Sequence, residues 1–197
     1  ITSHASVVAE TVQKILDVTI TWKIEAAGKI DADIAVTKDD EFPDLPRFGV
    51  RMFLDKKLSA VRYFGMGPQE SYCDKHQAAS HGLYQANVDD LHEDYIRPQE
   101  NGSHYDCEYV ELNNSRYGIV VSAENAFSFN ASYYTQEELE EKTHNYELTE
   151  SDSVVFCVDY ALNGIGSNSC GPVVLEQYRF DDVLFRFQFT LIPYIKG

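Results

Sequence analysis

Strict alternation of apolar and polar residues is the feature that most limits how this chain can fold. In the segment VTITWKIEA, apolar side chains occupy every second position from Val18 to Ile24, and the pattern resumes from Ile30 to Val36. A period of two places one set of side chains on a single face of an extended strand. Gly28 lies between the two runs and suits a tight turn. The segment therefore predicts a β-hairpin.

Further strands are predicted along most of the chain. A polar loop with two prolines, residues 37–46, follows the hairpin. Eight or more antiparallel strands with almost no helix must bury their apolar faces against one another. We therefore expect an all-β fold, a large antiparallel β-sandwich, and one domain over residues 1–197. The remaining predicted strands cover residues 48–54, 60–65, 117–123, 127–132, 153–160 and 183–192.

The last predicted strand carries an aromatic stripe that could bind a sugar or fill a core. Its alternate positions from Val183 to Leu191 include three phenylalanines. At strand spacing in an all-β protein such a stripe is typical of core packing, and we expect it there. Trp22, the single tryptophan, shares a strand face with Ile20 and Ile24 and is expected in the core as well.

One short helix is predicted on the surface. Thr135 is followed three residues later by Glu138, which is a capping-box pattern. The segment TQEELEEKTH places acidic residues early and Lys142 late, as the helix dipole favours. Leu139 is almost its only apolar residue, so we expect a connector that lies on the sandwich.

The middle of the chain, residues 64–106, loses the alternation and is rich in Gly, Pro and polar residues. Long ordered loops in a compact domain tend to carry function. Exposed tyrosines in such a region could form the platform of a carbohydrate-binding module. The candidates are Tyr63, Tyr72, Tyr84, Tyr95 and Tyr105.

Charge and hydropathy exclude two classes of partner. The formal net charge of −16 argues against nucleic acid and anionic membranes, because both require clustered Lys and Arg. No apolar run approaches the length of a transmembrane helix. The first residues, ITSHASVV, contain neither Met nor a signal-peptide pattern, so we expect further sequence upstream.

The four cysteines suggest a reducing compartment. Their spacing matches no structural zinc site, and sparse cysteines in a chain of this size fit buried thiols of a cytoplasmic protein. A disulfide stays open from sequence alone. The four are Cys73, Cys107, Cys157 and Cys170.

Candidate acid–base residues are few. Glycosidases need two carboxylates that flank the scissile bond, and none of the 32 acidic residues has a distinctive catalytic setting. Glu70 and Glu100, in the loop-rich middle, are the two candidates that we consider. A sugar epimerase could pair a histidine with a carboxylate. The spacing of the histidines matches no common metal motif, so we expect them to be polar surface residues. These histidines are His76, His81, His92 and His104.

Several motifs occur together in one order: RYFGMGPQESYCDKH, YIRPQENGSHYDCEYVEL, FSFNASYYTQEELEEKTH and GIGSNSCGP. Together they resemble the C-terminal β-sandwich domain of the large bacterial β-galactosidases of glycoside hydrolase family 2, also called the β-galactosidase small chain. The resemblance extends from about residue 18 to residue 192. It implies a supersandwich similar to galactose mutarotase.

The resemblance places the chemistry elsewhere in the parent enzyme. Both catalytic glutamates of that family lie on a TIM-barrel domain upstream, as do the ligands of Mg²⁺ and Na⁺. It therefore implies no catalytic residue, metal or cofactor in this chain, with Mg²⁺ and Na⁺ bound by the parent. The catalytic domain or large subunit is the implied partner, in a parent that is oligomeric and hydrolyses β-galactosides such as lactose with retention.

The loop GIGSNSCGP, residues 164–172, is the implied contribution of this chain to the sugar pocket. Some relatives carry a tryptophan on this loop that stacks on the sugar, and Cys170 is its nearest counterpart here. A cysteine offers no aromatic platform, which leaves hydrogen bonds from Asn168 or Ser169. The alternatives from sequence are a free-standing aldose-1-epimerase-like protein and a galactoside-binding module.

Overall fold

The computed structural model describes residues 1–8, 13–164 and 174–196. Within these ranges the chain forms ten strands, the helix α1 (Gln136–Glu141) and three single-turn helices, η1 (Val88–Leu91), η2 (Asn145–Glu147) and η3 (Glu176–Tyr178). The strands are β1 (Thr2–Val8), β2 (Lys14–Ile24), β3 (Ile30–Lys38), β4 (Arg47–Asp55), β5 (Ala60–Gly67), β6 (Ser80–Asn87), β7 (Ser103–Asn113), β8 (Tyr117–Ser132), β9 (Ser153–Leu162) and β10 (Leu184–Ile195).

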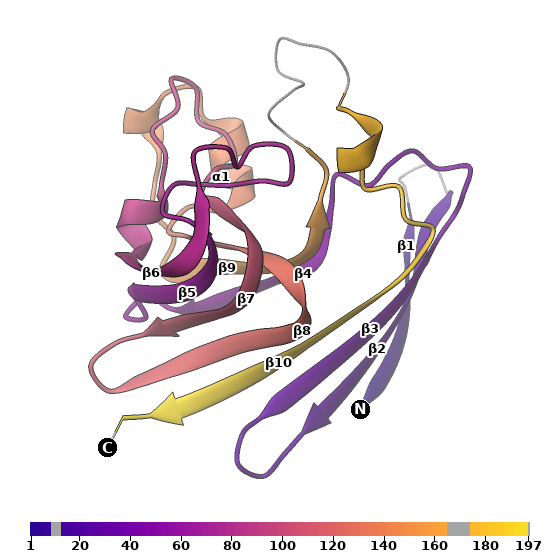
Figure 1. The fold of residues 1–197 in the computed structure, drawn as a ribbon, viewed down its shortest axis with the longest axis horizontal. Coiled ribbons are helices and arrows are strands. Elements are labelled where there is room, and N and C mark those ends of the chain that lie inside the picture. The colour runs from indigo at the N-terminus through magenta and orange to yellow at the C-terminus, as the bar shows by residue number, and fades with distance from the viewer. Residues whose placement is uncertain (9–12, 165–173, 197) are drawn as a thin grey trace.

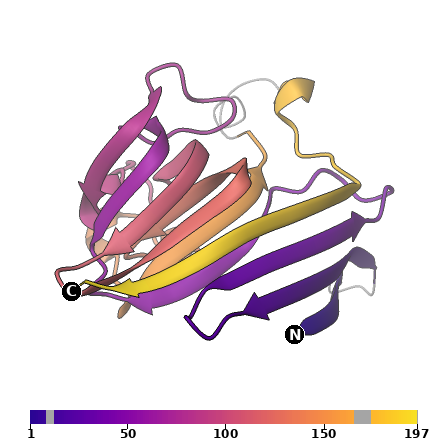
Figure 2. The same ribbon diagram turned by 60° about the horizontal axis from the view of Figure 1, so that its bottom comes forward.

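The strands form a strongly curved antiparallel sheet that branches. The main path runs β1-β2-β3-β10-β8-β7-β5-β6, with β1 and β6 at its edges. Figure 1 shows β1, β2, β3 and β10 fanned out on one side, and in Figure 2 β3 and β2 lie side by side next to β10. The remaining strands β4 and β9 leave this path, because β9 pairs with both β4 and β8. The sequence-based prediction of an all-β antiparallel sandwich is confirmed.

The branch point is the long strand β8. Its first half, up to Ser122, pairs with β10, whereas its second half, from Ser128, pairs with β9. The residues between these halves, 124–126, are exposed. β8 therefore belongs both to the main path and to the branch that β4 and β9 form, and we call these two parts the layers of the fold. For this reason the two predicted strands at 117–123 and 127–132 are a single element.

The two layers enclose an aromatic core. Phe48 of β4 meets Phe185 of β10 edge to face, with ring centroids 5.0 Å apart. Tyr160 of β9 stacks on the same Phe185 at 4.7 Å. Such pairs stabilise a core beyond the area that they bury. The phenylalanine stripe of β10 is thus core, as predicted, while Val183 at its start is exposed.

The predicted hairpin is confirmed as β2 and β3. Gly28 has a φ of +90° in the turn, a conformation that costs glycine little. Trp22 is half-buried against Phe189, with ring centroids 6.4 Å apart, so its predicted core position is confirmed in part. Ile24, expected beside it, is exposed instead.

The predicted surface helix is confirmed as α1. The Thr135 hydroxyl accepts a hydrogen bond from the Glu138 amide at 3.1 Å, as the capping pattern requires. Leu139 is the buried residue that attaches the helix to the sandwich.

Three of the described strands were not predicted from the sequence: β1, β6 and β7. The segment at 64–106, expected to be loops, contains the whole of β6 and the start of β7. All residues of β1 are exposed, so burial leaves no pattern there. Among the described residues, no helix combines the length and the apolar character needed to cross a bilayer.

Candidate functional site

The two described ends of the GIGSNSCGP loop lie close together at one end of the sandwich. A Cβ built on Gly164 would meet Val174 Cγ1 at 2.9 Å and Asp74 Oδ2 at 2.5 Å. Asn163 fixes this region, because its amide donates to the Pro46 carbonyl at 2.9 Å. The predicted site residues Asn168, Ser169 and Cys170 lie outside the described residues.

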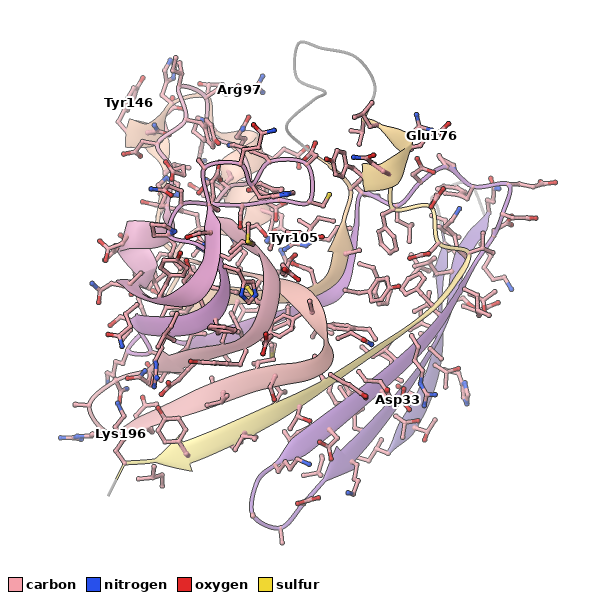
Figure 3. The ribbon with its side chains drawn as sticks, in the orientation of Figure 1. Asp33, Arg97, Tyr105, Tyr146, Glu176 and Lys196 are labelled. Atoms are coloured by element: carbon pink, nitrogen blue, oxygen red, sulfur yellow. The ribbon has the colours of Figure 1, made fainter. Side chains whose placement is uncertain are left out.

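A cavity of about 440 Å³ opens beside these loop ends. It sits where the sheet branches, between the exposed bend of β8, the end of β9 and the single turn η3. This volume is within the range of small-molecule pockets. We call it the branch cavity, and its lining includes Tyr105, Asp106, Asn125, Tyr160, Tyr178 and Asp182. Figure 3 shows Tyr105 near the middle of the molecule.

The branch cavity combines aromatic rings with polar groups. The Tyr160 hydroxyl donates to Asp182 at 3.2 Å. Burial raises the pKa of Tyr105, so its hydroxyl stays neutral at physiological pH. Asp106 lies on a bulge of β7 with a φ of +56°, a strained backbone for a residue other than glycine. Such a lining suits hydrogen bonding and stacking.

Cys73 joins the walls of this cavity. Its thiol approaches the carbonyl of Leu162, at 3.6 Å, and that of Tyr178, at 3.7 Å. Burial raises the pKa of Cys73 to about 11, so the group stays a thiol and is a poor nucleophile. The described cysteines, which include the buried Cys107 and Cys157, are free thiols.

Glu70, a candidate catalytic acid by sequence, is buried in a network of donors. Its carboxylate accepts from the Gly102 amide at 2.8 Å, from Lys75 at 2.5 Å and from the hydroxyls of Tyr72 and Tyr95. Burial alone would raise the pKa of Glu70, but these donors outweigh it and the pKa falls below its usual value. A general acid needs the opposite shift, so Glu70 is suited to hold loops together.

Glu100, the second candidate acid, pairs with Arg47. The same guanidinium donates twice, at 2.7 Å, to the buried carboxylate of Asp159. Burial disfavours the charged guanidinium, but the pair with Asp159 prevails and raises the pKa of Arg47. Arg47 therefore stays charged and ties β4 to β9. Sequence reasoning missed this pair, whose members lie 112 residues apart.

The histidines are not a uniform surface set, so that prediction was wrong for His104. His104 is buried, stacks on Phe129 at 5.0 Å, and its Nδ1 contacts the Met66 carbonyl at 3.3 Å. His76 stacks on Tyr105. Neither histidine belongs to a metal site. In the described part of the chain, no group of three His, Cys, Asp or Glu side chains is arranged to hold a metal ion.

The predicted tyrosine platform is also wrong in part. Tyr63 and Tyr72 are buried, and Tyr63 packs on His104 within the core. Tyr105 and Tyr95 are partly buried and line different cavities. Tyr105 lines the branch cavity with Cys73, and Tyr95 lines a second cavity with Lys75. Alternation within the strand could have found Tyr63, because Val61 two residues before it is a core position.

Comparison with known proteins decides the family. A family model described as beta galactosidase small chain matches residues 1–191. The chain belongs to the β-galactosidase small chain family. It is 50% identical, over 179 residues, to a β-galactosidase of Actinobacillus pleuropneumoniae, covering 91% of this chain and 17% of that protein.

Two further relatives extend the match across organisms. A β-galactosidase of Staphylococcus xylosus is 38% identical over 188 residues, which cover 95% of this chain and 19% of that protein. One from Kluyveromyces lactis is 32% identical over 168 residues, covering 84% and 16%. The chain thus spans less than a fifth of the length of these relatives.

Proposed function

We propose that this chain is a non-catalytic component of a β-galactosidase that hydrolyses terminal β-D-galactosides such as lactose with retention. The family match over residues 1–191 carries the proposal. The site geometry supports it, because Glu70 and Glu100 are both engaged in structural pairs. The catalytic carboxylates then belong to the remaining, larger part of the enzyme, a TIM-barrel domain or a large subunit in the cytoplasm.

Within that enzyme, we propose that the loop at residues 164–172 completes the rim of the galactose pocket. Asn168 and Ser169 would offer hydrogen bonds there, and Cys170 occupies the place of a stacking tryptophan. The anchoring of Gly164 and Val174 beside Asp74 supports a fixed position for the two loop ends. Mg²⁺ and Na⁺, where the enzyme uses them, would be held by the larger part.

Hydrolysis of a nitrophenyl galactoside tests this proposal. The 197-residue chain alone is expected to show no turnover, whereas the complete enzyme does. Turnover by the isolated chain that survives removal of host enzymes, and is lost in Glu70→Gln or Glu100→Gln, would contradict the proposal. A complete enzyme without activity on galactosides would contradict it as well.

Galactoside binding by the chain itself is a second candidate, favoured by the branch cavity. Its tyrosine rings and polar groups match the needs of a sugar, which stacks its apolar face and hydrogen-bonds its hydroxyls. Calorimetry with galactose should then show binding that Tyr105→Ala abolishes and Tyr109→Ala, outside the cavity on β7, retains. The absence of heat at millimolar galactose would exclude this function.

An epimerase is the third candidate, and one contact favours it. His81 Nε2 lies 3.0 Å from the Asp106 carbonyl and 3.9 Å from its carboxylate, beside the branch cavity. Polarimetry should then show faster interconversion of galactose anomers, and the acceleration should disappear in His81→Ala. An unchanged rate in the presence of the wild-type chain would exclude it.

A further inference from the structure

Two large apolar side chains stand almost fully exposed on neighbouring loops. Ile96 is 98% exposed and Tyr146 is 82% exposed. The loops that carry them touch, because Asn145 Nδ2 donates to the Tyr95 carbonyl at 2.9 Å. Figure 3 shows Tyr146 and Arg97 near each other at the end of the molecule. We call Ile96, Arg97 and Tyr146 the loop-end patch.

The patch is held in place by its neighbours. The hydroxyl of Tyr95 bonds the buried Glu70, which anchors the first loop to the sandwich. The Tyr146 ring stacks on His144, with centroids 5.1 Å apart, and the Glu147 carboxylate accepts the His144 amide at 3.0 Å. A fixed apolar surface loses little conformational entropy on binding, which favours a docking role.

The loop-end patch lies at the same end of the molecule as Glu176, close in sequence to Val174, one of the two described residues that flank the proposed rim loop. Figure 1 shows α1, η3 and both described ends of that loop at the top, while the hairpin turn of β2 and β3 and the chain terminus lie at the bottom. Leu175, next to the loop end at Val174, is 59% exposed there. A partner that meets the rim loop would therefore also face this end.

From these observations we propose that the loop-end patch docks the larger, catalytic part of the β-galactosidase. The inference rests on the proposed function. More than four-fifths of the length of each relative lies outside the region matched here. That larger part is the partner for this surface, whether it continues the same chain or forms a separate subunit. Adjacent exposed apolar groups with a polar rim mark such interaction sites, whereas single ones are ordinary.

Charge defines the chemistry of the facing surface. Carboxylates dominate around the patch: residues 93–97 and 140–147 together hold Glu93, Asp94, Glu140, Glu141 and Glu147 against Arg97 and Lys142. The facing surface should offer an apolar recess for Ile96 with basic residues at its rim. Raised salt should then weaken the contact by screening the rim charges.

The first experiment compares hydrogen exchange in the complete enzyme and in the 197-residue chain. Amides at 93–97 and 143–147 should exchange about tenfold more slowly in the complete enzyme. Amides around Ile195, an isoleucine that is 86% exposed beside Lys196 at the opposite end, should not change. Equal exchange at the patch in both samples would overturn the proposal.

The second experiment uses matched isoleucine substitutions. Ile96→Asp should lower the Tm of the complete enzyme by roughly 3 °C or more and leave the Tm of the isolated chain unchanged. Ile195→Asp should leave both unchanged. Tyr146→Ser should repeat the effect of Ile96→Asp. Equal Tm values for Ile96→Asp and wild type in the complete enzyme would overturn the docking role.

Two outcomes separate the docking role from the proposed function. If the complete enzyme hydrolyses galactosides but Ile96→Asp and exchange show no contact, the docking role fails and the proposed function stands. If the complete enzyme lacks galactosidase activity, the proposed function fails. Size-exclusion chromatography showing that the chain alone dimerises through the patch, and loses the dimer in Ile96→Asp, would assign the surface to a second copy and overturn the proposal.

Discussion

A single buried carboxylate, that of Glu70, decides how the loops between β5 and β7 are held. The Glu70 carboxylate gathers donors from three separate loop positions, Tyr72, Tyr95 and Gly102, with Lys75 as its counter-ion. Gly102 can direct its amide there because its φ of +72° suits glycine. A buried carboxylate with these partners costs little, whereas its loss leaves donors unpaired.

Glu70→Gln should destabilise the fold by about 1–3 kcal/mol at neutral pH, because Lys75 loses its counter-ion and an amide cannot accept from all four donors. The pKa of Glu70 is lowered in the folded state, so its stabilising effect is present above the usual pKa and is lost as pH falls through the folded value. Denaturant unfolding at several pH values should show that the free energy of unfolding falls less below pH 4.5 in Glu70→Gln than in the wild type. Glu124→Gln, exposed on β8, is the control and should match wild type.

The burial of His104 predicts a second pH range in which folding stability changes. Burial lowers the pKa of His104 to about 4, from an ordinary value of 6.5, so the folded state keeps it neutral. The unfolded chain binds the extra proton between these values, and folding stability should fall by roughly 2–3 kcal/mol as pH drops from 6.5 to 4.

Replacing His104 with Phe removes this titration while an aromatic ring still packs on Phe129. Urea unfolding at several pH values should then show a flatter profile between pH 4 and 6.5. His4→Phe, on the exposed strand β1, should retain the wild-type slope. An unchanged slope in His104→Phe would show that other groups carry the loss.

At the scale of elements, the bulges of β7 explain why sequence patterns found some strands and missed others. Register shifts between His104 and Tyr109 put Cys107 and Val110 both in the core, which breaks the period of two. In β6 the exposed face carries Leu83, 51% exposed, while the inward positions hold Gly82 and Tyr84. The apolar residue faces outward, so alternation gives no signal there.

The bulge also stores backbone strain that substitution can reveal. Asp106→Gly should leave stability unchanged or raise it by up to about 1 kcal/mol, because glycine tolerates the positive φ. Asp106→Val should lower stability by more than about 1 kcal/mol, since a β-branched residue is excluded from that conformation. Chemical denaturation measures both, with Glu108→Val on the same strand as the control. Equal stability for both Asp106 variants would contradict the assignment of backbone strain to this position.

For the whole molecule, the family resemblance predicts how the rim loop acts in the complete enzyme. Cys170→Trp should restore an aromatic platform and lower KM for a nitrophenyl galactoside about tenfold, with stronger inhibition by galactose. Cys170→Ser is the control, because it changes the polarity without adding a ring. Unchanged KM and inhibition in Cys170→Trp would mean that the loop does not reach the sugar.

What the sequence alone determined is local. Alternation at 18–36 specifies a hairpin because period two buries one face, and Thr135 with Glu138 specifies a helix start because the cap forms within four residues. The family motifs, including those around Glu70, also lie in contiguous segments. These features need no knowledge of distant residues.

Only the tertiary structure decided what depends on distant partners. Sharing one strand, β8, between two layers creates the branch cavity, and no segment encodes that by itself. The burial of His104 and the pairing of Arg47 with Asp159 likewise arise from strands that are remote in sequence. Burial, and with it pKa and charge pairing, is a property of what the fold brings together, so the roles of Glu70, Glu100 and His104 appear only in three dimensions.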